Sequence, residues 1–360
     1  MFLKNIKRFS AVLLVSIIGF VCFSCSKQSN GQVKNEGGKY DRMYYMAAWQ
    51  LSAEGSMEMM QAFNTAKSRI SNIIEMANDE SNHEWSYKTI GGKKVLFHND
   101  LRAAIISDID DTLVNGSNYS AKIIGASGDW NNAAFARFVM SDNCIALPGS
   151  VEFVNYCVDN GIDFYYLTNR YDQGYKIGQK DSASSYEQSI EKDGKGNYVR
   201  ANGEEIGSSI YQVFGKSFYD ISYESMQRLG FPVNDQMLLI NDSKLNGSSK
   251  QKYRDTIVLG CTDYPNGVRE NENALGLKST FSCDKHDIIM LLGDQSTDFT
   301  DDLTANGIDA VKRAEKALEY SEKFGREWII LPNGIYGTSQ DAANKYGYEK
   351  LFTYYSELNM

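Results

Sequence analysis

Proline and histidine are scarce in this chain, which has four prolines and three histidines among 360 residues. Four prolines cannot form a proline-rich linker between domains. None of the histidines lies in an Arg-His-Gly arrangement, which leaves phosphoryl transfer through a histidine without support. We interpret His83, His98 and His286 as surface or core residues.

The chain also lacks an excess of basic residues. It contains 37 Lys and Arg and 46 Asp and Glu, and its formal net charge is -9 at pH 7. A surface that binds nucleic acid usually needs a basic excess. The composition therefore argues against a nucleic-acid partner. It does not exclude a small anionic ligand at a local site.

Beyond residue 25 the chain has no CxxC pair, so the sequence gives no sign of a zinc site. Export from the cytoplasm would permit disulfides, but four cysteines allow three pairings and their spacing does not choose among them. The four are Cys144, Cys157, Cys261 and Cys283.

The first 25 residues differ from the rest. Three basic residues precede an apolar run, 11–23, which is too short for a membrane span and has the length of a signal-peptide core. A small residue, Ser24, then precedes Cys25. This resembles a bacterial lipoprotein signal, in which cleavage before Cys25 would make that cysteine the lipid anchor. A plain secretory signal is the alternative.

We therefore expect a signal peptide at 1–24, a polar tether at 25–38 and one folded domain at 39–360. Strand-like and helical segments alternate along this domain. Such alternation predicts an α/β fold, a mostly parallel sheet flanked by helices, here with a smaller helical cap region at its N-terminal side. Strands are expected at 94–97, 103–107, 162–168, 236–242, 286–295 and 327–334, and helices at 41–78, 130–140, 148–161 and 309–325.

Residues 172–222 interrupt this alternation. They are polar and rich in Gly, Ser and Tyr, and the stretch "GKGNYVRANGEEI" within them suits a hairpin. We interpret 172–222 as an insertion between core elements.

Polar residues follow the predicted strands at the point where each one ends. In a parallel sheet, ligands bind beyond the carboxyl ends of the strands. The sequence therefore predicts that these side chains converge on one edge. They are Asp108 and Asp110, Thr168 and Asn169, Lys250, Asp294 and Asp298, and Asn333.

Asp108 and Asp110 are two residues apart, which points both side chains to one side of an extended backbone. Like charges so close would raise one pKa unless a cation compensates them. Mg²⁺ suits this need, and Asp294 would complete its protein ligands. A calcium loop is the alternative, but that loop needs a ligand and a glycine where Thr112 and Leu113 stand.

These residue types suit phosphoryl transfer. One carboxylate can attack phosphorus and form an aspartyl-phosphate, and the second can move the proton. A lysine, a threonine hydroxyl and Mg²⁺ can neutralise the phosphoryl oxygens in the transition state. Thr112 is expected to fix the Asp110 side chain.

The stretches "DIDDTL", "YYLTNR", "SSKQKYR" and "GDQSTDF" resemble the four motifs of the haloacid dehalogenase superfamily. The second aspartate, Asp110, favours its phosphatases over its dehalogenases. "AAWQLSAE", "LPGSVEFVNY" and "FGREWIILPNGIYG" are similar to the lipoprotein-e family of class C acid phosphatases, which are outer-membrane 5′-nucleotidases. The likeness runs from about Trp49 to Gly337.

The resemblance implies a role for each matching residue. Asp108 would be the nucleophile and Asp110 the acid and base. Asp108, the main-chain oxygen of Asp110, and Asp294 would bind Mg²⁺. Thr168 and Lys250 would hold the phosphate, and Asp298 would support the metal and the lysine.

The resemblance also implies an aromatic clamp on a nucleoside. Phe135 and Phe138 occupy the offsets of a family Trp-x-x-Trp pair, with Trp130 just upstream, and Tyr336 matches the second clamp residue. Asn169 is assigned to substrate binding. The alternative places Phe135 and Phe138 in the core of a helix.

The function expected from these features is a Mg²⁺-dependent acid phosphatase or 5′-nucleotidase. It would act on a phosphomonoester such as a nucleoside 5′-monophosphate, from an exported lipoprotein in the outer membrane. Two alternatives stay open, a non-catalytic surface protein that binds nucleotide or haem, and phosphotransfer to an alcohol. The sequence leaves a homodimer open.

Overall fold

The computed structural model describes residues 39–125, 132–170, 190–192, 198–200, 216, 218–241, 249–263, 284–304 and 310–337. The chain divides into two units, Met1–Gly38 and Lys39–Met360, and all described residues belong to the second. The predicted lipid anchor, Cys25, and Trp130 lie outside the described residues. None of the described helices is long and apolar enough to cross a membrane.

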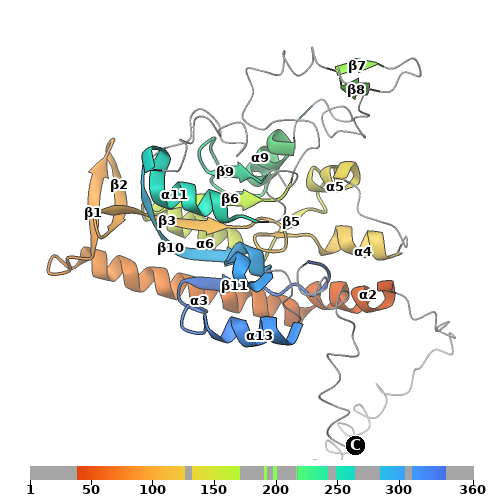
Figure 1. Cartoon of the computed structure of the whole chain (residues 1–360), viewed down its shortest axis with the longest axis horizontal. Coiled ribbons are helices and arrows are strands. Elements are labelled where there is room, and N and C mark those ends of the chain that lie inside the picture. Colours follow the sequence, from red (N-terminus) through yellow and green to blue (C-terminus); the bar gives the residue numbers. More distant parts are fainter. Residues whose placement is uncertain are drawn as a thin grey trace, which may run out of the picture. The chain divides into compact units, whose positions relative to one another are not determined.

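A seven-stranded sheet forms the centre of the described structure (Figure 1). Five strands are parallel, in the order β9-β6-β3-β10-β11, and the predicted α/β class is confirmed. The antiparallel pair β1-β2 joins the start of β3. The strands are β1 (Trp85–Ile90), β2 (Lys93–His98), β3 (Leu101–Ser107), β6 (Asp163–Thr168), β9 (Leu238–Ile240), β10 (His286–Gly293) and β11 (Trp328–Ile330).

The β1-β2 hairpin was only half visible in the sequence, which predicted a strand at 94–97 and none before it. Gly91 and Gly92 both have positive φ, and so do Asn99 and Asp100 in the turn that leads into β3. Two-residue turns of this kind match the twist of the flanking strands. The Gly-Gly and Asn-Asp pairs were therefore the missed signals.

Helices cover both faces of the sheet. On one face lie α3 (Ala53–Asn78), α6 (Ser150–Asp159) and α9 (Phe218–Arg228), and on the other lies α11 (Gln251–Asp263). β3 alternates between them, because Ile105 belongs to the first core cluster and Ile106 to the second. The buried face of α3 repeats at three- and four-residue steps and consists of Met59, Phe63, Ala66, Ile70 and Ile73.

Smaller elements lie beyond the carboxyl ends of the strands in Figure 1. They are α2 (Lys39–Gln50), α4 (Ser117–Gly125) and α5 (Asn132–Val139), together with the short pair β4 (Val114–Asn115) and β5 (Ile145–Ala146). Two 3₁₀ turns, η2 (Ser296–Asp298) and η3 (Asp301–Thr304), follow β10, and α13 (Ala310–Leu318) precedes β11.

The predicted insertion needs one correction. It contains an antiparallel hairpin, β7 (Ile190–Lys192) with β8 (Tyr198–Arg200), close to the expected position. Its end at residue 222 was wrong, however, because α9 begins at Phe218 and buries Phe218 and Ile221 in a core cluster. The polar composition of 172–217 concealed that boundary.

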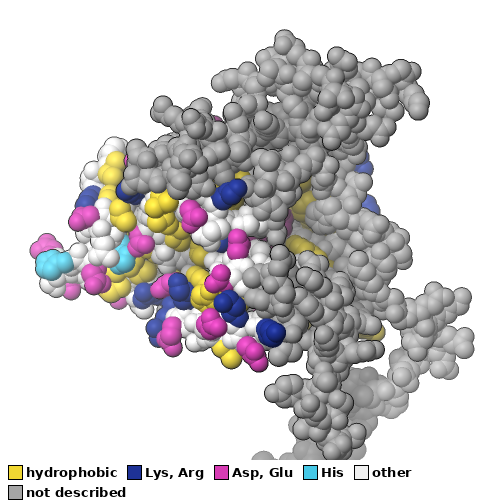
Figure 2. Space-filling model, in the orientation of Figure 1, with side chains coloured by type: hydrophobic (Ala, Val, Ile, Leu, Met, Phe, Trp, Pro, Cys, Tyr) yellow, Lys and Arg dark blue, Asp and Glu magenta, His cyan; other side chains and the backbone are white. Residues whose placement is uncertain are grey.

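Cys144 and Cys157 are buried free thiols, so they are not paired with each other. His286 is a core residue and His83 is exposed, as expected. On the face drawn in Figure 2, acidic and basic side chains are interspersed among the described residues, so neither sign dominates there.

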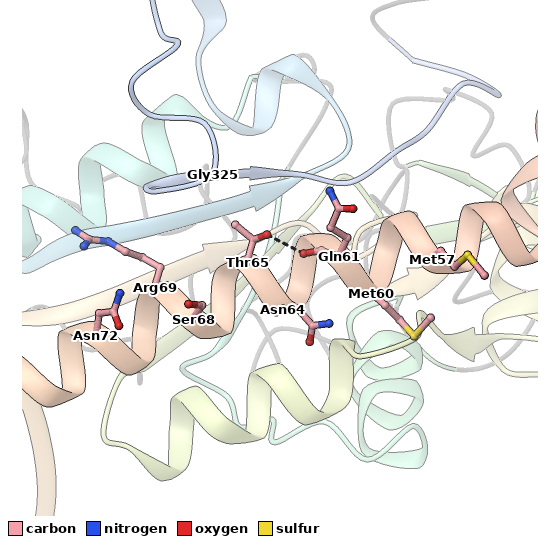
Figure 3. A pocket seen from close by; sticks show the side chains of 9 residues that line it. All are labelled: Met57, Met60, Gln61, Asn64, Thr65, Ser68, Arg69, Asn72 and Gly325. Carbon is pink, nitrogen blue, oxygen red and sulfur yellow. Dashed lines mark hydrogen bonds between the residues drawn. The ribbon is translucent and has the colours of Figure 1, made fainter.

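A shallow depression follows the outward face of α3 (Figure 3). Met57, Met60, Gln61 and Arg69 are among the residues that line it, and Gly325 lies opposite. Thr65 Oγ1 donates a hydrogen bond to the Gln61 carbonyl at 2.8 Å within it. Its lining contains no carboxylate, so this depression offers neither the nucleophile nor the metal ligands that the predicted phosphoryl transfer needs.

The amino ends of β3, β6 and β10 are joined by a charged cluster. Arg102 Nε and Nη2 donate to the two carboxylate oxygens of Asp163 at 2.7 and 2.8 Å, and His286 Nε2 lies 3.0 Å from Asp163 Oδ2. Burial would raise the pKa of Asp163, but His286 and Arg102 outweigh it and lower that pKa. Asp163 therefore stabilises the fold in its ionised form.

We predict that Asp163→Asn lowers the free energy of unfolding at pH 7 by about 1–3 kcal/mol, because a bidentate charged pair is lost. Because the pKa of Asp163 is lowered in the folded state, the ionised carboxylate stabilises the protein at pH values above the ordinary aspartate pKa. This contribution disappears as the pH falls through the lowered pKa. Urea denaturation at pH 7 and at pH 3 measures both effects. If the free energies of unfolding of variant and wild type differed by the same amount at both pH values, ionised Asp163 would not be the source of the stability.

Candidate active site

The central strand β3 delivers Asp108 to the carboxyl edge of the sheet. The Asp108 backbone N–H donates to the Leu292 carbonyl at 3.0 Å, which continues the pairing with β10, and the next residue, Ile109, is fully buried. The Asp108 side chain stays reachable, with 9% of the residue exposed. A buried strand thus carries a carboxylate to a semi-enclosed position.

Lys250, immediately before α11, compensates this carboxylate. Its Nζ lies 2.5 Å from Asp108 Oδ1 and 2.7 Å from Asp298 Oδ1, and the residue is 2% exposed. Burial alone would lower the pKa of Lys250, but the two carboxylates outweigh it and raise that pKa. Among the described residues, Asp108 Oδ2 accepts no hydrogen bond, so this oxygen is free to face a substrate.

Asp294 reaches the same place from the end of β10. Its Oδ2 accepts hydrogen bonds from Gln295 Nε2 and Asn333 Nδ2, both at 2.7 Å, and its Oδ1 accepts one from Thr112 Oγ1 at 3.1 Å. The expectation that Thr112 fixes Asp110 was therefore wrong. Thr112 is buried and its hydroxyl turns toward Asp294, which comes from a strand that the sequence does not place beside it.

Asp298 lies one 3₁₀ turn later and is fully engaged. Its Oδ1 accepts from Lys250, and its Oδ2 accepts from the Gln295 backbone N–H at 2.8 Å. Arg254 Nη1 donates to the Thr297 and Asp298 carbonyls at 3.0 and 2.9 Å, which ties this turn to α11. A side chain at Gly293 would meet the Asp298 side chain at 2.2 Å, so this position requires glycine.

Asp110 is paired with Arg170, a residue that the sequence analysis did not assign. Arg170 Nε and Nη2 donate to the two Asp110 carboxylate oxygens at 2.8 and 2.7 Å. Arg170 is 3% exposed, and its Nη1 also donates to Ser222 Oγ of α9 at 3.2 Å. The signal was present, because Arg170 closes the "TNR" stretch directly after β6.

Thr168 ends β6 beside this pair, and Asn169 follows it. Thr168 is 1% exposed, and its Oγ1 lies 3.4 Å from Asp110 Oδ2, so the structure brings it to the predicted site. Asn169 is exposed, and its Oδ1 accepts a hydrogen bond from Asn241 Nδ2 at 2.7 Å. Asn241 therefore orients the side-chain amide of Asn169 at the exposed edge of the site.

The two predicted clamp residues have different surroundings. Phe135 is 3% exposed and packs among Tyr119 and Phe218 at ring-centroid distances of 5.0 and 6.0 Å. This burial favours the alternative of a core residue. Tyr336 is partly buried, and its hydroxyl donates to Asp111 Oδ2 at 2.6 Å.

The carboxylates fit a divalent cation. One ligand oxygen from each of Asp108, Asp294 and Asp298 lies within 4.8 Å of the others. Burial, together with Asp298 and other carboxylates, raises the pKa of Asp294 to about 7, and burial also raises the pKa of Asp108. A hard cation with oxygen ligands would remove this excess of buried negative charge. Asp298 already pairs with Lys250, whereas Asp294 pairs with no basic side chain among the described residues, and direct ligation by Asp108 and Asp294 stays a prediction.

A reachable aspartate beside a buried lysine, with a second acid two residues on, fits one class of enzyme, the phosphatases that transfer the phosphoryl group to a carboxylate. Residues 33–228 match the model of the haloacid dehalogenase (HAD) superfamily, subfamily IIIB (acid phosphatase), and the chain belongs to this family. It is a phosphomonoester hydrolase. Lys250, Asp294 and Asp298 lie beyond the matched residues.

Solved structures show the same fold. The class C acid phosphatase from Bacillus anthracis is 18% identical, with a TM-score of 0.53, over 86% of this chain and 92% of that one. A crystal structure of the class C acid phosphatase from Bacillus anthracis with tungstate bound is 19% identical, with a TM-score of 0.54, over 87% and 92%.

We predict that Arg170→Lys lowers kcat about tenfold, because lysine keeps the charge but loses the two-pronged contact that orients Asp110. Arg228→Lys is the control, since Arg228 contacts the Val139 and Cys144 carbonyls and no catalytic carboxylate. Steady-state phosphate release across pH measures kcat for both. If Arg170→Lys kept the wild-type kcat and pH profile, Arg170 would not position Asp110.

Proposed function

We propose that the protein is a Mg²⁺-dependent acid phosphatase that hydrolyses nucleoside 5′-monophosphates through an aspartyl-phosphate. The observation that carries this proposal is Lys250 Nζ, 2.5 Å from Asp108 and 2.7 Å from Asp298, beside the Asp294 carboxylate. Before substrate binds, a lysine in this position neutralises the Asp108 carboxylate. When substrate binds, the same lysine can neutralise the phosphoryl oxygens instead.

Hydrolysis then proceeds in two displacements. Asp108 Oδ2 attacks phosphorus, the ester P–O bond breaks, and Asp110 gives a proton to the leaving oxygen. In the second displacement Asp110 takes a proton from a water molecule, which attacks phosphorus and releases Asp108 and inorganic phosphate. When bound, Mg²⁺ supplies positive charge for the phosphoryl oxygens. Asp108, Asp294 and the main-chain oxygen of Asp110 would hold it.

The remaining polar side chains position these groups. Thr168 Oγ1 and Lys250 Nζ would donate hydrogen bonds to the phosphoryl oxygens. Arg170 uses one lone pair on each Asp110 oxygen, and each oxygen keeps a second lone pair at which Asp110 would carry the proton.

The nucleotide part of the proposal rests on the similarity to class C sequences and on Tyr336, a partly buried ring beside the catalytic turn. With Phe135 packed in the core, a two-ring clamp is not supported. A single stacking ring still favours a planar base over an aliphatic leaving group. The alternative of a non-catalytic binder of nucleotide or haem is not favoured, because the chain belongs to a phosphatase family and its reactive groups lie together.

Export and lipid anchoring are supported by the sequence of residues 1–25 alone. A phosphatase in the outer membrane would convert a charged nucleotide into an uncharged nucleoside before uptake. The lipid would hold the enzyme at the membrane by its N-terminal tether, 25–38.

We predict that Asp108→Asn abolishes phosphate release from a 5′-nucleotide, because an amide cannot attack phosphorus, and that chelation of Mg²⁺ has the same effect on the wild type. Asp159→Asn, at an exposed carboxylate that ends α6, is the matched control and should retain wild-type rates. If Asp108→Asn released phosphate at the wild-type rate, Asp108 would not be the nucleophile. Transfer to an added alcohol would instead identify phosphotransfer.

A second prediction concerns Cys25. Cys25→Ser should shift the protein from the membrane fraction to the soluble exported fraction, because the acylated residue is lost. Immunoblots of fractionated cells and incorporation of labelled palmitate measure this. Label in the serine variant equal to that in wild type would argue against the anchor, and a plain secretory signal would then be favoured.

A further inference from the structure

The third carboxylate of the catalytic turn, Asp111, takes no part in the two displacements. It is 1% exposed and has a positive φ of 54°, which is uncommon for a residue other than glycine. Its Oδ1 accepts the Gly116 backbone N–H at 3.0 Å, and its Oδ2 accepts the Tyr336 hydroxyl at 2.6 Å. A side chain at Gly116 would lie 2.8 Å from Asp111 Oδ2, so the turn closes around this carboxylate.

The partner of Asp111 belongs to the loop Asn333–Gly337, whose other end reaches Asp294. Asn333 Nδ2 donates to Asp294 Oδ2 at 2.7 Å. Gln295 Nε2 donates to the same oxygen at 2.7 Å and to the Tyr336 carbonyl at 3.3 Å. Two of the side chains that orient Asp294 therefore depend on where this loop lies.

The loop is anchored at two further points. Ile335 is fully buried with Ala47 of α2, and Gln50 Nε2 donates at 3.0 Å to the carbonyl of Pro332, the residue directly before the loop. These contacts hold the loop against α2. Within the described part of the chain, the Tyr336 hydroxyl joins the loop to the catalytic turn itself, through Asp111.

We propose that Asp111 is a positioning residue which acts through the Tyr336 hydroxyl. The pair fixes the Asn333–Gly337 loop against the Asp108–Asp111 turn and so sets the orientation of Asp294 toward a cation. This inference rests on the proposed metal role of Asp294. In this inference the Tyr336 hydroxyl positions the loop through Asp111, while the face of its ring stacks on a base.

The two tasks can be separated, because phenylalanine keeps the ring and removes the hydroxyl. Without that hydroxyl, Asp111 Oδ2 loses a buried hydrogen bond and the loop loses its link to the turn. Partners that orient a metal ligand typically change metal affinity about 10–100-fold when they are substituted. Stacking on a base would be almost unchanged.

The test measures the Kd of Mg²⁺ by calorimetry on the metal-free whole chain, and kcat/KM for phenyl phosphate and for a 5′-nucleotide at limiting Mg²⁺. Tyr336→Phe should weaken Mg²⁺ binding about tenfold or more and lower kcat/KM equally for both substrates. Tyr166→Phe is the matched control, because the Tyr166 hydroxyl also donates a partly buried 2.6 Å hydrogen bond, to the Pro232 carbonyl, and contacts no residue of the site. It should leave the Mg²⁺ Kd unchanged.

Asp111→Ala, which removes the acceptor of the Tyr336 hydroxyl, provides the second variant. It should weaken Mg²⁺ binding to a similar extent as Tyr336→Phe. The double variant should bind Mg²⁺ as tightly as the single variant with the higher Kd, because both substitutions remove the same link. Tyr336→Phe with a wild-type Mg²⁺ Kd, or with a loss confined to the nucleotide, would overturn the inference. A wild-type protein that binds no Mg²⁺ would refute the proposed metal role as well.

Discussion

The structure of this site depends on the neutralisation of buried negative charge. Four carboxylates, those of Asp108, Asp110, Asp294 and Asp298, converge where parallel strands end, and such a cluster would cost too much unless cations balance it. Lys250 lies between Asp108 and Asp298, and Arg170 pairs with Asp110. Two cations therefore serve three of these four carboxylates, and among the described residues Asp294, whose pKa burial and neighbouring carboxylates raise to about 7, pairs with no basic side chain. This remaining charge is the physical reason to expect a metal ion.

The compensation needs exact placement, and the surrounding residues provide it through contacts with the main chain. Arg254 holds the carbonyls of the turn that carries Asp298, and Gly293 leaves room for that turn to approach β10. The loop after β11 orients Asp294 through Asn333. Each catalytic side chain is thus fixed by a neighbour from another segment of the chain, which is how a rigid scaffold keeps reactive groups in place before the substrate arrives.

Local pattern was enough to predict the strands that lead to the site and the order of the acids along them. β3, β6, β9 and β10 are short apolar runs that end in polar residues, and the rule for parallel sheets places those ends together. Side-chain partners were harder to foresee, because they join segments far apart in the sequence. Thr112 turned toward Asp294 and not Asp110, and Phe135 packed into the core. The position of Arg170 directly after β6 indicated that it lies near the site, but the local sequence does not show that Asp110 is its partner.

The central claim is that Asp108, held ready by Lys250, is the group that accepts the phosphoryl group. The most direct measurement mixes the enzyme with a phosphomonoester and Mg²⁺, quenches the reaction in acid within milliseconds, and locates phosphate on the chain by peptide mass spectrometry. The account predicts phosphate on the peptide that contains Asp108, attached as an acyl phosphate that alkali releases. Phosphate on a serine or a histidine, or turnover with no covalent phosphate at any quench time, would contradict it.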